Sequence, residues 1–159
     1  MPFGRIRVTI LVEAPLFLGA RSRYTLRWGP LPMNQPNLTV VEVKAFVPAR
    51  DFVLSMAFYQ ALGFLRASVF EDIAYFHCGE SGFLLQDFYV REHAHNFQMH
   101  LLVESVDDWY KKAKVVAEQF SVKIGEPEDR PWAMRDFTLF DPSDVLWRIA
   151  QNIPRQGAS

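Results

Sequence analysis

Polar and apolar residues alternate in two short runs near the end of the chain, at residues 134–140 and 145–150. Alternation with a period of two is typical of a strand that buries one face, so each run predicts a strand. The residues between the runs, 141–144, read Asp-Pro-Ser-Asp, and these residue types favour a tight turn. The stretch 130–150 is therefore predicted to be a β-hairpin, with Trp132 at its entrance.

The first half of the chain predicts a β-α-β-β-β order over residues 39–90. Residues 40–47 alternate and are rich in β-branched side chains, which favours a strand. Asp51 is a good N-cap for a helix over 52–62, and Gly63 follows as a natural terminator. Three further strands are expected at 64–70, 73–78 and 83–90.

The second half repeats this order over residues 96–151. A polar linker at 91–96, which holds His93 and His95, precedes a predicted strand at 97–103. Ser105 and Asp108 have the spacing of a capping box for a helix over 106–120. A short strand at 122–124 and a loop at 126–132 then lead into the hairpin.

The two predicted helix caps lie 105 − 51 = 54 residues apart, which aligns the halves. The sequence thus predicts an α+β fold: two βαβββ modules with curved mixed sheets that enclose a cavity. The matches expected to face that cavity are Lys44 with Gln98, Phe46 with His100, and Gln86 with Arg148.

Composition limits the class of protein. With 159 residues, half of them hydrophobic, the chain is long enough for one domain with a real core. A formal net charge of −1 gives no reason to expect nucleic acid as a partner, and no long apolar run predicts a membrane span. The single Cys78 excludes an intrachain disulfide and favours the cytoplasm.

Charge is uneven along the chain. Residues 1–32 carry five Arg and one Glu, hence +4, while 33–159 carry twelve basic and seventeen acidic residues, hence −5. An acidic domain suits a cationic small molecule, although a solvated surface is the simpler explanation. We interpret residues 1–38 as an N-terminal extension and Pro-rich linker, either accessory or a mis-assigned start, and 152–159 as a tail.

Three motifs carry a family resemblance over residues 39–151. They are DFVLSMAFYQALGF at 51–64, the helix entry at 103–108, and PWAMRDFTLFDPSDVLWRI at 131–149. In this order and spacing the chain resembles the glyoxalase/bleomycin resistance group of the vicinal oxygen chelate superfamily. The resemblance implies paired βαβββ modules, and a dimer whose modules or subunits enclose the sites.

Members of that superfamily that depend on a metal carry His, Glu or Gln ligands on the first and last strand of each module. The matching residues here are Lys44, Gln86, Gln98 and Arg148. Two of these are cations that repel a divalent ion, and two amides alone hold a transition metal weakly. We therefore expect no metal and no cofactor, which removes the source of isomerase or dioxygenase chemistry.

The remaining branch of the family binds antibiotics without chemistry. Its motif before the turn matches Trp132, Ala133, Arg135, Asp136 and Phe137. The resemblance implies that the Trp offers its face to a flat heteroaromatic group and that acids meet a cation. Two departures stand out, because Ala133 replaces the usual Gly and Ser143-Asp144 replaces the usual Asp-Gly.

Several candidate residues have a plain structural alternative. Trp132 is expected to stack on a ligand, to pack in a dimer or to join the core. Asp136 meets a cationic ligand or forms an internal ion pair with Arg148 or Lys44. The full predicted ligand-binding set is Trp132, Asp136, Arg135, Met134, Phe46, Gln86, Phe88, Gln98, His100, Lys44 and Arg148.

The expected function is metal-independent sequestration of a cationic, amphipathic aromatic small molecule by a homodimer. The alternative is an enzyme of the same superfamily, a lyase, isomerase or dioxygenase with a displaced metal site or a Lys44/His100 base. A third hypothesis is a dimeric module with no small ligand. His93 and His95 lack a third metal ligand nearby, and His77 and Cys78 point to opposite faces of a strand.

Overall fold

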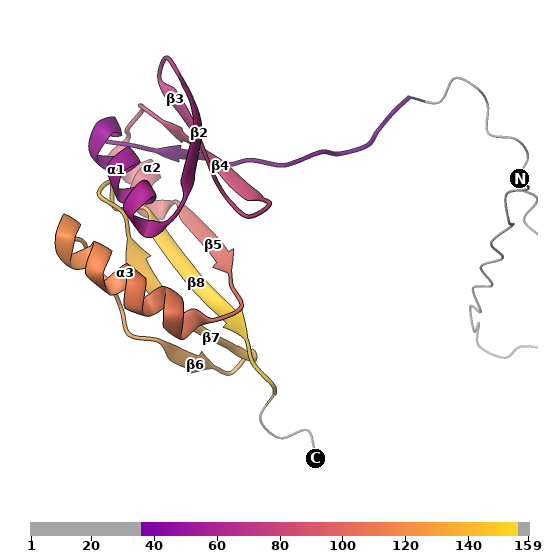
Figure 1. Ribbon diagram of the computed structural model, residues 1–159, viewed down its shortest axis with the longest axis vertical. Coiled ribbons are helices and arrows are strands. Elements are labelled where there is room, and N and C mark those ends of the chain that lie inside the picture. The colour runs from indigo at the N-terminus through magenta and orange to yellow at the C-terminus, as the bar shows by residue number, and fades with distance from the viewer. Residues whose placement is uncertain (1–35, 156–159) are drawn as a thin grey trace, which may run out of the picture. The chain divides into compact units, whose positions relative to one another are not determined.

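The computed structural model describes residues 36–155. From Val40 onward the chain forms a compact unit in which the β-α-β-β-β order occurs twice (Figure 1), as the sequence predicts. The first module contains β1 (Phe46–Pro48), α1 (Phe52–Leu62), β2 (Leu65–Phe70), β3 (Ile73–Cys78) and β4 (Ser81–Gln86). After α2 (Arg91–Asn96), the second contains β5 (Gln98–Leu102), α3 (Val106–Phe120), β6 (Glu128–Arg130), β7 (Met134–Phe140) and β8 (Leu146–Asn152).

Each module forms one four-stranded sheet, and the two sheets are not joined into a closed barrel. Sheet A has the order β1-β4-β3-β2, and sheet B has the equivalent order β5-β8-β7-β6. In both sheets the first pair, β1 with β4 and β5 with β8, is parallel, and the other pairs are antiparallel. The predicted α+β class with two mixed sheets is confirmed.

Both long helices begin and end where the sequence predicts. The Asp51 carboxylate accepts from the backbone N–H of Leu54 at 2.9 Å, and Gly63 ends α1 with a φ of 116°. The Ser105 hydroxyl accepts from the backbone N–H of Asp108 at 3.4 Å and donates to its carboxylate at 2.7 Å. These side chains satisfy backbone donors that a helix leaves without partners at its start.

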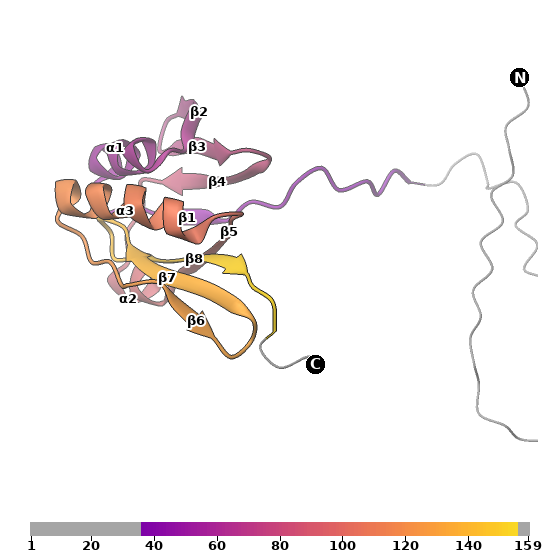
Figure 2. The ribbon, with the colours of Figure 1, turned by 60° about the horizontal axis from the view of Figure 1, so that its bottom comes forward.

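One aromatic core joins the modules. The rings of Phe83 in β4 and Trp147 in β8 lie 5.4 Å apart, so the covered faces of the two sheets meet. Phe58 of α1 and Phe120 of α3 pack edge to face at 5.5 Å, which brings the two helices together (Figure 2). The helices therefore lie on one side of the sheets, and the opposite sheet faces are left uncovered.

Four expectations about secondary structure are wrong. Residues 40–45 are not a strand, and β1 contains only 46–48, because a strand needs a neighbour to pair with. The strand expected at 83–90 ends at Gln86, and the strand expected at 122–124 is reduced to a single bridge between Ile124 and Leu139. Residues 128–130, placed in a loop, form β6 on the edge of sheet B.

The linker and the tail also differ from the expectation. Residues 91–96 form the short helix α2, which buries Ala94. The last strand continues to Asn152, and the backbone N–H of Ile153 donates to Ala133 at 3.0 Å, so the tail begins later than predicted. Most of the predicted extension 1–38, and residues 156–159 of the tail, lie outside the described residues.

The strand register changes one match between the modules. Phe46 pairs with Leu84, and its counterpart His100 pairs with Arg148. Leu84 is therefore the structural match of Arg148, whereas Gln86 matches Ala150. The shift is two residues, one full period of a strand, so the predicted side of the sheet is unchanged.

Candidate functional site

The candidate site is built on the open faces of the two sheets, meaning the faces turned away from α1 and α3. In β4, Phe83 and Leu85 are buried while Leu84 and Gln86 are partly exposed. In β8, Trp147 and Ile149 are buried while Leu146 and Arg148 are partly exposed. Alternation thus places Gln86 on the open face of sheet A and Arg148 on that of sheet B.

The open face of sheet A is largely apolar. Phe46, Leu84 and Tyr75 form a row across three neighbouring strands, and Phe46 is 48% exposed. The ammonium group of Lys44 lies 4.7 Å from the centroid of the Tyr75 ring. A side chain at Gly82 would lie 2.7 Å from that ring, so the glycine leaves room for it. Tyr75 belongs to this face although the sequence analysis did not select it.

The open face of sheet B is polar at its centre. Gln98, His100 and Leu102 alternate along β5, and all three are exposed. Because His100 pairs with Arg148 and Gln98 with Leu146, Gln98 and Arg148 are diagonal neighbours on one face. The structure thus brings two of the predicted cavity residues together in sheet B.

Asp136 is the most constrained of the predicted site residues. It is completely buried, and its Oδ1 accepts from Arg130 Nε at 3.0 Å and from Arg148 Nη1 at 2.9 Å. Of the two internal partners that the sequence analysis left open, Arg148 is the one observed, while Lys44 pairs with Glu42. Arg130 is an additional partner, and it also donates to Glu128 at 2.7 Å.

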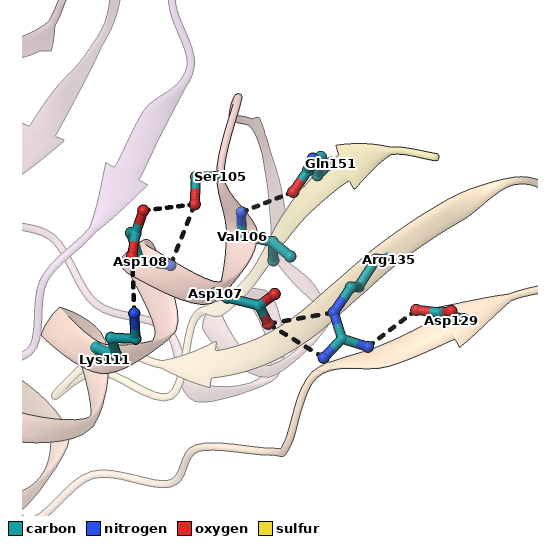
Figure 3. Close-up of polar contacts among 8 residues, drawn as sticks. All are labelled: Ser105, Val106, Asp107, Asp108, Lys111, Asp129, Arg135 and Gln151. Atoms are coloured by element: carbon teal, nitrogen blue, oxygen red, sulfur yellow. Dashed lines mark hydrogen bonds and ion pairs between the residues drawn. The ribbon is translucent and has the colours of Figure 1, made fainter. Parts of the chain in front are cut away.

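Arg135 lies on the side of sheet B that faces α3 (Figure 3), and alternation along β7 places its neighbour Asp136 on the opposite side. Its guanidinium donates to Asp107 in the first turn of α3, at 3.1 and 3.2 Å, and to Asp129 of β6 at 2.9 Å. These carboxylates raise the pKa of Arg135. Arg135 therefore fastens α3 to sheet B and does not join the other predicted residues on the open face.

Trp132 lies in the turn between β6 and β7 and is 61% exposed. From its sequence, Trp132 is expected to stack on a ligand, to pack in a dimer or to join the core. Its exposure excludes the core of this chain. Met134 follows on the open side of β7, half-buried beside Arg130. A cavity of about 410 Å³ lies beside the turn, between the β6–β7 hairpin and residues 153–155, and its lining includes Pro131 and Ala133.

The remaining candidates, Phe88 and Lys44, lie outside the strands of sheet A. Phe88 follows β4 in an irregular segment and is 52% exposed. Lys44 precedes β1 instead of lying within it. Neither the cavity beside Trp132 nor the two others described, at the start of α3 and at the 141–144 turn, is lined by both open faces. None of these three cavities therefore corresponds to the one predicted between the modules.

A buried polar network lies behind the site. The Tyr59 hydroxyl of α1 donates to Asp141 Oδ2 at 2.6 Å and accepts from Trp147 Nε1 at 3.1 Å. Asp141 Oδ1 accepts from the backbone N–H groups of Ser143 and Val145. Burial raises the pKa of Asp141 to about 6, although these three hydrogen bonds favour its charged form. Burial also raises the pKa of Tyr59 well above its usual value.

Two features are absent from the described residues, a cluster of metal ligands and a membrane-spanning helix. Between residues 36 and 155, no three His, Cys, Asp or Glu side chains are grouped to hold a metal ion. The described helices include none that is long and apolar enough to cross a membrane.

Sequence comparisons identify the family. The model of the Glyoxalase/Bleomycin resistance protein/Dioxygenase superfamily matches residues 41–149. The chain belongs to this superfamily. A bleomycin resistance protein of Klebsiella pneumoniae is 30% identical over 114 residues, which cover 67% of this chain and 88% of the relative.

Solved structures of bleomycin-binding and bleomycin resistance proteins have the same fold. A bleomycin-binding protein crystallised with bleomycin superposes with a TM-score of 0.62 at 24% identity, covering 71% of this chain and 99% of that protein. A bleomycin resistance determinant encoded on the transposon Tn5 gives 0.60 at 21% identity, covering 71% and 98%. At these identities the likeness establishes the architecture only.

The two positions where the sequence departs from the superfamily pattern lie in turns and have positive φ values. Ala133 and Asp144, which stand where glycine is usual, have φ values of 62° and 66°. Positive φ favours glycine because a Cβ atom crowds the backbone there. The chain keeps both turns with a strained residue in each, and Asp144 also lies 3.3 Å from His95 Nε2.

Proposed function

We propose that this protein sequesters a bleomycin-like aromatic small molecule without a metal ion, as a cytoplasmic homodimer. The observation that carries the proposal is the pair of open faces. One is a row of apolar and aromatic side chains. The other holds a buried carboxylate between two arginines, one of which, Arg148, stands where the superfamily pattern would place a metal ligand.

The donor set supports binding without a metal. The resemblance assigns the metal-ligand positions to Lys44, Gln86, Gln98 and Arg148. By strand register, the match of Arg148 in the first module is Leu84, whose side chain is no metal ligand either. Arg148 already donates to Asp136, and a guanidinium has no lone pair to offer a cation. Arg148 therefore offers no ligand atom for a metal ion that would act as a Lewis acid.

Exposed aromatic side chains support recognition of a flat ligand. Trp132 and Phe46 are 61% and 48% exposed, and Leu102 on the open face of sheet B is 54% exposed. Rings of this size lose water-exposed apolar area when a flat molecule stacks on them. A heteroaromatic ligand would cover them at little cost in side-chain entropy, because Trp and Phe have few rotatable bonds.

The structure changes which group would meet a ligand cation. The sequence left open whether Asp136 meets a ligand cation or pairs internally, and two arginines lie beside that carboxylate. Ring faces are the better partners, because the aromatic quadrupole attracts cations. The Lys44 ammonium over Tyr75 is an internal example of that contact on sheet A.

Exposed apolar residues support the dimer. Val40, Val41 and Val43 precede β1 and are 75%, 95% and 87% exposed. Phe46 and Leu102, on the open faces, are also exposed apolar side chains, and such side chains are common at interfaces between protein chains. A second copy would cover such a surface and give the open faces the enclosure that one chain lacks.

The test is a titration of the purified full chain with bleomycin, followed by thermal shift and calorimetry. Bound ligand should raise the melting temperature, because it stabilises the folded state by RT ln(1 + L/Kd), where L is the concentration of free ligand. Trp132→Ala should weaken binding about tenfold, since a stacked ring contributes about 0.5–1.5 kcal/mol in addition to the apolar area it buries. Val115→Ala, on the solvent side of α3, removes an exposed apolar side chain as a control and should leave Kd unchanged.

Two results would contradict the proposal. One is a melting temperature that bleomycin does not change at any concentration, while metal analysis finds no ion. The other is a stoichiometric transition metal in the purified protein, which would favour the superfamily's enzymes over a binding protein.

A further inference from the structure

Asp136 leaves one carboxylate oxygen without a protein partner. Among residues 36–155, Oδ1 receives both arginine hydrogen bonds, whereas Oδ2 is fully buried and receives none. A buried carboxylate oxygen without a donor costs more than an ordinary missing hydrogen bond, because charged groups lose the most on leaving water. This oxygen is therefore a strong acceptor on the open side of β7.

The two arginines are arranged so that neither serves Oδ2. Arg130 donates its Nε to Asp136 and its Nη1 to Glu128, which divides its guanidinium between two carboxylates. Arg148 donates to Asp136 through Nη1 at one point instead of through two parallel bonds. A guanidinium has five N–H donors, so Arg148 has donors to offer to another group.

An acceptor and donors therefore lie side by side. A group that complements both offers a donor next to an acceptor, and the N–H and carbonyl oxygen of a carboxamide or a cyclic amide have this pattern. Building on the proposed function, we propose that Asp136 and Arg148 together recognise an amide group of the ligand. The ligand N–H donates to Asp136 Oδ2, and its carbonyl oxygen accepts from Arg148.

The cover over Asp136 decides how the amide gains access. Asp136 itself is fully covered, but the Arg148 side chain is 34% exposed and reaches it from the next strand. The ligand carbonyl draws the Arg148 guanidinium outward, while Arg130 keeps its contact with Oδ1. The carboxylate therefore stays paired throughout, which avoids the cost of an isolated buried charge.

The experiment compares three aromatic probes on the full chain by calorimetry. They are naphthalene-2-carboxamide, its N,N-dimethyl amide and methyl naphthalene-2-carboxylate. All three carry the same ring and a carbonyl, but only the first has N–H donors. The carboxamide should bind about tenfold more tightly than either of the others, as expected for a hydrogen bond to a charged acceptor.

Variants assign that preference to residues. Asp136→Asn should bring the three affinities within about twofold of one another, because a neutral amide is a weaker acceptor. Arg148→Lys should weaken all three probes alike, since the carbonyl is common to them. Glu118→Gln is the control, because Glu118 lies on α3, which covers the other face of the sheets, and it should keep the tenfold preference.

The outcomes separate this inference from the proposed function. Equal affinities in the wild-type protein, or a preference that persists in Asp136→Asn, overturn the amide site and leave sequestration intact. Bleomycin binding without binding of any probe does the same. If neither bleomycin nor a probe binds, both proposals fail. If Asp136→Asn does not fold, the wild-type comparison and Arg148→Lys decide the question.

Discussion

Sheets A and B share one layout but differ in what they show to solvent. Leu84 and Arg148 occupy matching places, each paired with the residue five positions before the N-cap of its module's helix. Sheet A presents Leu84 between Phe46 and Tyr75, whereas sheet B presents Arg148 beside His100 and over Asp136.

The covered faces have not diverged in this way. Phe83 and Leu85 in sheet A, and Trp147 and Ile149 in sheet B, are all apolar and buried. A shared core restricts the residues on one face, because any polar group there needs a partner. The open faces are free of that restriction, so a duplicated module can divide apolar contact and polar recognition between its halves.

The largest effect is expected from Tyr59→Phe, which breaks the buried hydrogen-bond network between the two modules. Without the hydroxyl, Asp141 loses a donor and Trp147 loses an acceptor, both buried, and unfolding should become easier by about 2–4 kcal/mol. Tyr110→Phe is the matched control, because its hydroxyl is near the surface, and it should cost under about 1 kcal/mol. Similar losses in urea denaturation would show that the network does not join the modules.

The next largest effect is a pH dependence of stability that comes from Asp141 in the same hydrogen-bond network. The pKa of Asp141 is raised from 3.8 to about 6 on folding, so the folded state binds the proton more tightly. Its contribution to stability is complete below pH 3.8 and is lost as pH rises through about 6. Between pH 7 and pH 4 the wild type should gain about 1–3 kcal/mol relative to Asp141→Asn. Parallel stability curves for the two proteins would contradict this.

The contrast between the sheets is tested by exchanging the matching residues. Arg148→Leu removes one of two cations from a buried carboxylate and should cost about 1–2 kcal/mol, discounted for the exposure of Arg148. Leu84→Arg should cost less, because a long side chain can place its charge in water. In an Asp136→Asn background the Arg148→Leu cost should shrink. Equal costs in both backgrounds would mean that the pair contributes nothing to stability.

The smallest effect is expected at the strained turns. Ala133→Gly should stabilise the protein by about 0.5–1 kcal/mol, because glycine adopts positive φ without crowding. Asp144→Gly should gain less, since it also loses the His95 contact. Ala61→Gly, inside α1, is the opposite control and should lose about 1 kcal/mol in the same thermal melts. A loss of stability at Ala133→Gly would contradict the strain.

The sequence predicts the two long helices to the residue, because local caps determine where they begin and end. It overextends the first strand, because alternation does not reveal whether a neighbour is present. With Phe46 opposite Leu84, residue 43 would meet Ser81, where β4 begins, so residues 40–42 have no partner strand there. Helix α2 was missed because only one of its six side chains is buried.

The site is predictable only in part. Strand parity correctly assigns Gln86, Gln98 and Arg148 to open faces, and the same parity would have separated Arg135 from Asp136 and selected Tyr75. Whether Asp136 pairs internally could not be decided from the sequence, since Arg130 lies in a strand that pattern analysis placed in a loop. Register and edge pairing are properties of the assembled sheet.

The hydrogen bond from Tyr59 to Asp141 also has a kinetic consequence. It joins residues 82 positions apart, whereas the strands β2, β3 and β4 connect through short turns. Closing a long chain segment costs entropy before the contact is formed, and such distant contacts slow folding. The two modules cannot come together until the second module has been synthesised. Contacts with other chains therefore compete most strongly with this step of folding.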